Sequence, residues 1–286
     1  MQFRRADIGL GGNSSQKYHH KLPKFKFIPT AVAIQHPEQG TVKAALLFSG
    51  SCPMFFLSPR CLLCDRSCDG FGSVQVRLCL TCEHQICAAK RDQPLGTMSD
   101  NPVMPLFTWA DYEGNLRQSI ARLKYHRMRT IGTWLGQQMA DAWITQDLHR
   151  TERRLVVVPI PMFAAKEKIR GYNQAAVIAR QFARTIGYRY EPKLLCRNRE
   201  TQAQYAVDPR SRASNVDGAF SLNHGPKINP QDRILIVDDI YTTGATVRSA
   251  LSTLSPSFGP SLKVWGVAVA ASPVFETRFQ PNEAVV

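Results

Sequence analysis

The sequence predicts an α/β protein with a doubly wound parallel sheet, preceded by a small module with four paired cysteines. Two short apolar runs, at 155–159 and 234–237, are each followed by a polar loop and then by apolar residues at helical spacing. Continuous apolar runs of this length are typical of strands buried on both faces, as in parallel sheets. In such a sheet, ligands bind at the carboxyl ends of the strands.

The length and charge of the chain limit its class. A chain of 286 residues can form one large or two modest domains with a sizeable core. It carries 36 Lys and Arg against 22 Asp and Glu, a net charge of +14. This excess favours an anionic partner, whether nucleic acid, a membrane face or a sugar phosphate, without choosing among them. The longest apolar stretch, 44–57, is interrupted by Gly50 and Pro53, so the sequence predicts no membrane span.

Residues 1–53 are predicted to be a disordered N-terminal extension. They are rich in Lys, His, Gly, Ser and Gln and show no sustained period of a strand or helix. A translation start at Met54 is an alternative hypothesis, because it would place the first cysteine pair near the beginning of the chain. The intact mass of the native protein would decide between the two.

Two Cys-x-x-Cys pairs, Cys61 with Cys64 and Cys79 with Cys82, are separated by 14 residues. Each tight turn can present two thiolates, and together they would complete a tetrahedral zinc site. We therefore expect a zinc-ribbon module over residues 54–90 that folds on its metal, in a reducing cytoplasm. A redox or disulfide pair is the alternative. Cys68, His84 and Cys87 are possible substitute ligands, and Cys52 and Cys196 are expected to be buried thiols.

Between this module and the sheet, the sequence indicates a linker over 91–110 and a helical hood or connector over 111–150. The linker is inferred from polar residues and three prolines between 88 and 105. Apolar residues at helical spacing follow in the hood. The cationic cluster at 124–129 either complements the dipole of the first hood helix or contacts a substrate or nucleic acid.

The main domain is expected over 151–275, with a C-terminal tail at 276–286. Its first strand, 155–159, leads into a basic segment with Gly171 and then an amphipathic helix at 173–186. A basic loop at a helix N-terminus suits an anion, although a solvated basic turn is the alternative. The candidate anion-binding residues of this segment are Pro161, Lys166, Lys168 and Arg170.

Residues 197–215 are polar and basic and have no periodicity, between short strands expected at 194–196 and 218–222. A loop this long in a compact domain is typically a functional lid, and a disordered insertion is the alternative. A final buried strand is expected at 262–270. The lid candidates are Arg197, Arg199, Arg210 and Arg212.

The segment 233–247 combines a buried strand, two acids and a loop rich in threonine. Asp238 and Asp239 lie where the strand ends, and a helix is predicted from about Ala245. The loop at 242–246 therefore offers free N–H groups and hydroxyls to a phosphate, and Gly244 allows close approach. It has neither the lysine of a P-loop nor the three glycines of a dinucleotide fingerprint. The alternative is an ordinary turn with a threonine N-cap.

This segment resembles the phosphoribosyl pyrophosphate (PRPP) motif of type I phosphoribosyltransferases, and the chain as a whole resembles the ComF family of proteins like competence protein F and GntX. The resemblance covers roughly residues 54–271. Besides the cysteine pairs and the PRPP motif, it rests on Leu123-Lys124-Tyr125, Val158-Pro159-Ile160-Pro161, Arg170-Gly171-Tyr172-Asn173-Gln174, Thr201-Gln202-Ala203-Gln204, and Arg212 with Asn215 and Phe220.

The resemblance implies a type I phosphoribosyltransferase sheet that binds PRPP with Mg²⁺ bridging the pyrophosphate and the ribose hydroxyls. By this resemblance Asp238 and Asp239 would bind the ribose hydroxyls as the catalytic acids. The basic segment after the first strand would face the pyrophosphate, and the arginines of 197–212 would form the lid. The 5-phosphate would be held by Thr242, Thr243, Gly244, Ala245 and Thr246.

The family resemblance further implies a cytoplasmic protein of natural competence that transfers or hydrolyses the phosphoribosyl group. Its partners would be PRPP, single-stranded DNA and proteins of the competence machinery. A non-catalytic adaptor that binds DNA and partner proteins is the alternative function. Thr242 occupies a position where hypoxanthine-type enzymes carry an acid. Either the acceptor needs no such acid, or transfer is not the reaction.

Overall fold

The computed structural model describes residues 59–68, 77–98, 104–151, 154–198, 218–223, 228–229, 231–259 and 262–272. All of them belong to one unit that extends from Phe55 to Val286. The predictions for the extension at 1–53, for the tail at 276–286 and for the lid arginines Arg199, Arg210 and Arg212 fall outside the described residues.

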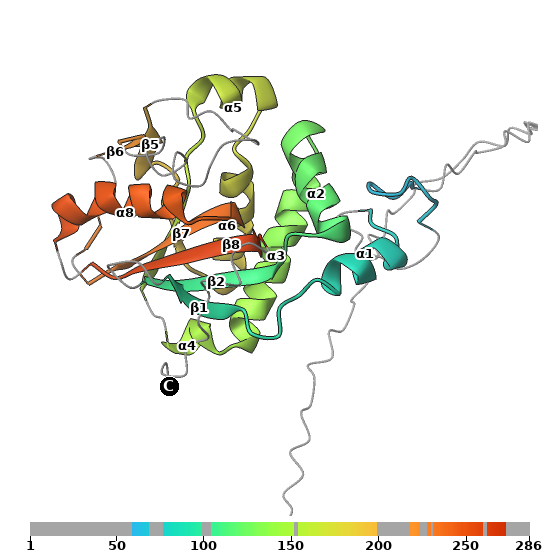
Figure 1. Ribbon diagram of the computed structural model, residues 1–286, viewed down its shortest axis with the longest axis horizontal. Helices are drawn as coiled ribbons and strands as arrows, with labels where there is room; N and C mark the ends of the chain where they lie inside the picture. Colours follow the sequence, from blue (N-terminus) through green and yellow to red (C-terminus); the bar gives the residue numbers. More distant parts are fainter. Residues whose placement is uncertain are drawn as a thin grey trace, which may run out of the picture. The chain divides into compact units, whose positions relative to one another are not determined.

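A six-stranded, mostly parallel sheet forms the centre of the unit (Figure 1). Its strand order is β1-β2-β8-β7-β3-β4, and only the edge pair β1–β2 is antiparallel among these neighbours. Two short strands, β5 (Leu195–Arg197) and β6 (Phe220–Leu222), pair separately. The strands of the large sheet are β1 (Leu95–Met98), β2 (Met104–Asp111), β3 (Leu155–Pro159), β4 (Arg189–Tyr190), β7 (Arg233–Tyr241) and β8 (Val264–Ala271).

Helices cover both faces of the sheet, as predicted for a doubly wound fold (Figure 1). On one face α3 (Arg129–Thr145) and α6 (Gln174–Ile186) pack around Trp143, whose ring lies 5.3 Å from Phe107, 5.7 Å from Phe182 and 5.3 Å from Trp265, centroid to centroid. On the other face, α8 (Ala245–Phe258) buries Val247, Ala250 and Leu254. The other helices are α1 (Leu80–Cys87), α2 (Gly114–Tyr125), α4 (Leu148–Thr151) and α5 (Ala164–Arg170).

The structure corrects the expected linker at 91–110. This segment contains β1 and β2, and β2 pairs in parallel with β8 near the middle of the sheet. The prolines of this segment made a strand difficult to recognise from the sequence. Pro105 nevertheless fits in β2, because it lies opposite the edge strand β1, where a missing N–H group is tolerated. The segment is therefore part of the sheet and belongs with the main domain.

The hood is helical, as expected from the spacing of Leu116, Ile120 and Leu123, which are all fully buried on α2. α2 is followed directly by α3, so 111–150 packs on the sheet rather than standing apart from it. Among the helices that the structure describes, none is long and apolar enough to cross a membrane.

Candidate functional site

The strand order reverses between β3 and β7. After β3 the chain returns through α6 to β4 on one side, and after β7 it returns through α8 to β8 on the other side. β3 and β7 are parallel neighbours, with Pro159, the last residue of β3, opposite Val237, and β7 continues to Tyr241. A crevice outside this point is where open α/β sheets bind their ligands.

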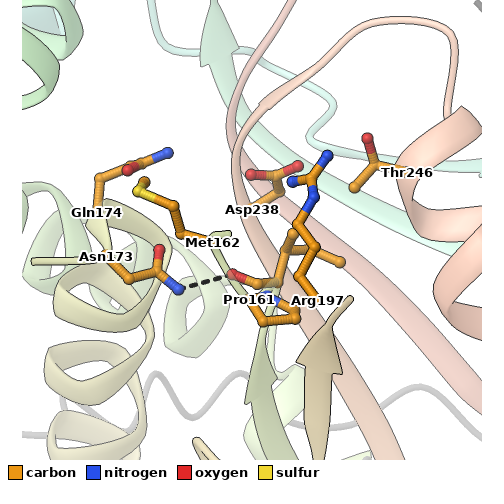
Figure 2. Close-up of a pocket in the computed structure, with 8 residues that line it drawn as sticks. Pro161, Met162, Asn173, Gln174, Arg197, Asp238 and Thr246 are labelled. Carbon is orange, nitrogen blue, oxygen red and sulfur yellow. Dashed lines mark hydrogen bonds between the residues drawn. The ribbon is translucent and has the colours of Figure 1, made fainter. Parts of the chain in front are cut away.

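A cavity of about 90 Å³ lies at this position. Figure 2 shows Asp238, Arg197 and Thr246 grouped on one side of it, and Met162, Asn173 and Gln174 on the other. Four of the eight lining residues were predicted from the sequence as site residues, and they come from three different segments. The lining consists of the predicted Pro161, Arg197, Asp238 and Thr246 and of Ile160, Met162, Asn173 and Gln174.

Asn173, which the sequence interpretation left out of the site, has a clear local role. The Asn173 side chain donates to the carbonyl of Ile160 at 2.8 Å and accepts from the N–H of Ala175 at 3.0 Å (Figure 2). It therefore caps α6 and ties the start of that helix to the end of β3. Its position just before an amphipathic helix was the signal that could have identified it.

The two acids near the end of β7 have different surroundings. Asp238 lines the cavity and accepts a hydrogen bond from the backbone N–H of Asp239 at 2.8 Å. Burial and the neighbouring Asp239 raise the pKa of Asp238 to about 8. Asp239 is itself buried, outside the lining of the cavity, and forms an ion pair of 2.7 Å with Lys124 of α2. Only Asp238 is thus in direct reach of a molecule in the cavity.

The threonine loop connects β7 to α8. Gly244 adopts a φ of 74°, the left-handed region that glycine enters without strain, and α8 begins at the next residue. The Thr243 hydroxyl accepts from the N–H of Ala245 at 3.4 Å, while Thr242 is exposed. Thr246, in the first turn of α8, lines the cavity. The N–H groups of this first turn, together with its dipole, suit an anion.

The predicted basic loop after β3 is mostly helical. Helix-forming residues build α5, which ends at Gly171 with a φ of 87°. The loop interpretation was wrong here, since the basic character of the segment concealed its helical propensity. Lys168 is exposed and Lys166 is half-buried, and neither belongs to the cavity lining. Arg170 donates to the Gln174 side chain at 2.6 Å. Because Gln174 lines the cavity, the Arg170 guanidinium contacts a residue of the cavity wall without lining the cavity itself.

Arg197 is the lid candidate that the structure describes. It ends β5, its guanidinium lies 5.4 Å from the centroid of the Phe220 ring, and it lines the cavity. A cation is therefore held beside Asp238 by a strand pair, on the opposite side of the cavity from α6.

The four paired cysteines come together. The Sγ atoms of Cys61, Cys64, Cys79 and Cys82 all lie within 4.8 Å of one another, and those of Cys64 and Cys79 are 3.7 Å apart. A tetrahedral site with metal–sulfur bonds of about 2.3 Å needs sulfur atoms about 3.8 Å apart. The cluster could therefore hold a metal ion, as the spacing predicted.

Local backbone geometry creates this arrangement. The turn after Cys61 closes through N–H donation from Asp65 to the Cys61 carbonyl at 3.0 Å, and Cys79 is the N-cap of α1. Burial alone would raise the pKa of the Cys61 thiol, but hydrogen bonds from the N–H groups around it lower the pKa to about 6. Burial and the neighbouring thiols raise the pKa of Cys82. Four close thiols cannot all ionise unless a cation balances their charge, and a bound metal ion would supply that cation.

The other cysteines of the described residues are outside the cluster. Cys68 and Cys87 are half-buried, and burial raises the pKa of each thiol. His84 is on α1, also outside the cluster. Cys196 is exposed, so its interpretation as a buried thiol was wrong: on β5 its neighbours Leu195 and Arg197 turn inward and Cys196 turns outward. Cys52 lies outside the described residues.

Comparison with curated proteins gives matches among competence proteins. The chain is 29% identical over 155 residues to Competence protein F of Haemophilus influenzae, which spans 53% of this chain and 66% of that protein. It is 28% identical over 169 residues to the DNA utilization protein YhgH of Escherichia coli K12, spanning 57% and 71%. The match to Competence protein ComFC of Bacillus subtilis is 26% over 143 residues, spanning 50% and 55%.

The relatives named Competence protein F, ComFC and YhgH support a relationship of this chain to the ComF family. No family model matches the chain. The resemblance deduced from its cysteine pairs and strand-end segments is thus confirmed. The ComF matches cover only about half to three quarters of the chain, and about two thirds of the Haemophilus protein.

The solved structures that this chain matches are phosphoribosyltransferases. A hypoxanthine phosphoribosyltransferase from Staphylococcus aureus matches with a TM-score of 0.33 and 14% identity, over 54% of this chain and 69% of that one. An adenine phosphoribosyltransferase from Trypanosoma brucei matches with a TM-score of 0.33 and 8% identity, over 72% and 88%. At scores this low, the fold is judged from the strand order of the chain itself.

Proposed function

We propose that this protein binds PRPP with Mg²⁺ in the cavity between β3 and β7 and acts in the uptake or use of external DNA. The observation that carries the proposal is the composition of the cavity wall. Pro161 was predicted for the pyrophosphate loop, Arg197 for the lid, and Asp238 and Thr246 for the ribose hydroxyls and the 5-phosphate. These residues of three sequence segments line one cavity at the switch point of the sheet.

Each part of PRPP has a matching group in this arrangement. The N-terminal turn of α8 and the loop 242–246 would take the ribose 5-phosphate, because free N–H groups favour an anion there. The half-buried Asp238, with the buried Asp239 next to it, would accept the ribose hydroxyls. Arg197 and the basic residues of α5 would lie on the side of the pyrophosphate. Mg²⁺ bound to PRPP would neutralise part of the pyrophosphate charge and stabilise it as a leaving group.

The chain's contribution to phosphoribosyl transfer or hydrolysis would be positioning and electrostatics. The anomeric carbon becomes cationic as the pyrophosphate leaves, and a fixed carboxylate beside the ribose stabilises that charge. In the ligand-free protein Asp238 has a raised pKa, so ligand hydroxyls and cations that favour its ionised form would bind together with loss of its proton. The acceptor is not specified by the residues around the cavity.

For the cysteine cluster, we propose a structural zinc ion. The four thiols match the number, type and spacing of ligands in closed zinc sites, which leave no position for a reaction. The metal would hold the turn at 61–64 against the start of α1.

A second function, a non-catalytic adaptor for single-stranded DNA, is favoured by the net charge of +14 and by relatives named for DNA utilization. A small cavity and an exposed threonine at 242 agree with a site that senses a ligand without an acceptor. The two functions predict different effects of replacing Asp238: binding of PRPP should depend on this residue, whereas binding of single-stranded DNA should not.

Calorimetric titration of PRPP into the full chain, with and without Mg²⁺, tests the leading function. Asp238→Asn is expected to weaken PRPP binding by about 10- to 100-fold, the range for losing a hydrogen bond to a charged group. Asp92→Asn, at an exposed position outside the cavity, is the matched control and should bind as the unaltered protein does. Binding of single-stranded DNA should be unaffected by Asp238→Asn.

Absence of PRPP binding at millimolar concentrations with Mg²⁺ would overturn the proposed site. The adaptor function would then be supported by affinity for single-stranded DNA that falls steeply with salt and is lost when the cysteine cluster is altered. If PRPP binds, a screen of acceptor bases and a pyrophosphate-release assay would separate transfer, hydrolysis and sensing.

A further inference from the structure

The C-terminal turn of α2 contacts both segments that flank the cavity. Lys124 pairs with Asp239, near the end of β7, with its Nζ atom 2.7 Å from Oδ2. One residue earlier, the backbone carbonyl of Leu123 accepts a hydrogen bond from the Tyr172 hydroxyl. Tyr172 directly precedes Asn173, the cap of α6 and part of the cavity wall. Two adjacent residues of α2 therefore hold the two halves of the site.

Three further contacts strengthen the link to the β3 side. The Arg127 guanidinium donates to the Ile169 carbonyl of α5 at 3.1 Å. Arg129 lies over the ring of Tyr172 at 5.2 Å, and Arg170 lies over the ring of Tyr125 at 5.6 Å. The cationic cluster predicted at 124–129 thus makes specific contacts with α5 and with Tyr172, rather than serving only as a charged helix end.

The ion pair is buried, and this gives it a strong influence on the acid pair. The side chains of Lys124 and Asp239 are 19% and 6% exposed. Burial would lower the pKa of Lys124, but the attraction of Asp239, and then of Asp238, outweighs it and the pKa is raised. The titratable groups that face Lys124 are these two acids and Tyr112, which follows β2. Removing the ammonium would leave two adjacent acids with one cation fewer in a poorly solvated place.

We propose that the C-terminal turn of α2 is a positioning element of the PRPP site, in which Lys124 fixes Asp239 and the loop after β7, and Leu123 fixes Tyr172 and the start of α6. The identity of the ligand in this inference rests on the proposed function, whereas the contacts of α2 do not depend on it. Neither Lys124 nor Tyr172 lines the cavity. Both act through other residues and are positioning residues, not catalytic ones.

Amide hydrogen exchange without ligand tests the positioning role of Lys124 directly. Lys124→Met is expected to raise exchange at least fivefold in 241–246 while β3 keeps the protection of the unaltered protein. Lys124→Arg keeps a cation and should restore most of the protection. Lys263→Met is the matched control, since Lys263 is exposed just before β8, at the amino ends of the strands, whereas the cavity lies toward their carboxyl ends. Lys263→Met should leave amide exchange unchanged both in 163–174 and in 241–246.

Tyr172→Phe tests the other contact by removing one hydroxyl. Exchange should rise at 163–174 and stay unchanged at 241–246. Tyr190→Phe removes an equivalent bond, from the Tyr190 hydroxyl to the Ala176 carbonyl at 3.1 Å, and should leave 163–171 unchanged. Should Lys124→Met fail to fold, the double variant with Asp239→Asn has no unpaired buried charge and should show the same raised exchange in 241–246.

PRPP affinity then measures the consequence for binding. Lys124→Met should weaken it by at least about tenfold, and more at pH 6 than at pH 8, because the acids take up a proton more readily without the cation. Lys124→Arg should keep the pH profile of the unaltered protein. A uniform rise in exchange, or unchanged exchange in both segments, would overturn the inference. If the unaltered protein does not bind PRPP, the proposed function fails while the exchange pattern still decides the role of α2.

Discussion

The cysteine cluster and the cavity represent two ways of building a site. The four thiols lie within 22 residues of sequence, from Cys61 to Cys82, and two short turns bring them together. The cavity takes its wall from segments between Ile160 and Thr246 that meet only because β3 and β7 are neighbours. A site of the first kind can be recognised from spacing alone, whereas a site of the second kind exists only once the sheet has formed.

The two sites also depend on different sources of stability. The cysteine segment contributes few large apolar side chains of its own, chiefly Leu63, Leu78 and Ile86, and these join the core cluster of α2 and α3. The cavity rests on a sheet whose strands β3, β7 and β8 are buried on both faces. We therefore expect metal to control the first site and close packing to control the second.

Removal of the metal is the largest expected effect and would separate the two sites. A structural zinc ion contributes on the order of 10 kcal/mol to folding of a small module at neutral pH. Chelation, or Cys61→Ser, should abolish amide protection at 61–68 and 79–87 and leave that of β3, β7 and β8 in place. Hydrogen exchange combined with metal analysis would measure both. A chelated protein in which the whole sheet loses protection would show that the sites are not independent.

Close packing of the frame around the cavity is tested at Gly136 in α3. A Cβ atom there would lie 2.4 Å from the Ile178 carbonyl oxygen of α6, and backbone has little freedom to move away. Gly136→Ala should lower the free energy of unfolding by about 3 kcal/mol, as overpacking does, in spite of the better helix propensity of alanine. Denaturant unfolding would measure the loss, and metal content should stay unchanged.

Gly132→Ala, one turn earlier on α3, is the matched control. Its Cβ atom would meet side-chain atoms of Leu123 and Val177 at 3.0 Å, and such atoms can shift by a few tenths of an ångström. A change of about 1 kcal/mol or less is expected. Equal losses for the two variants would mean that the distance between α3 and α6 does not limit the stability of the frame.

Much of the fold was predictable because its signals are local. The strand at 155–159 and the helix at 174–186 follow from continuous apolar residues and from helical spacing. β2 was missed because its proline, Pro105, is tolerated beside an edge strand, which is a property of the neighbour and not of the segment. α5 was missed because basic residues are equally compatible with a loop and with an exposed helix.

The candidate site was predictable only in part, for the same reason. Spacing identified all four thiols and the two acids near the end of β7. It did not separate the roles of Asp238 and Asp239, because the difference comes from Lys124, on a helix far away in the sequence. Asn173 and Gln174 were also missed as cavity residues, since their position depends on how α6 packs against the end of β3.

The pH dependence of stability sharpens the comparison at the cavity, and over one pH unit its effect is the smallest of the three. The pKa of Asp238 is about 8 in the folded, ligand-free protein, above its ordinary value of 3.8. The neutral carboxyl therefore contributes stability that is fully present below about pH 4 and is lost as pH rises through about 8. Between pH 6 and 7 the unaltered protein should lose up to about 1.4 kcal/mol of unfolding free energy relative to Asp238→Asn.

Denaturant unfolding of both proteins at several pH values would check this slope. Asparagine can still accept the N–H of Asp239, so the variant removes the titration and keeps the hydrogen bond. Asp92→Asn, at an exposed site, should follow the unaltered protein at every pH. Parallel pH profiles for Asp238→Asn and the unaltered protein would contradict a protonated Asp238. The cavity would then present a free carboxylate to its ligand, and Arg197 and Lys124 would be sufficient to hold both acids ionised.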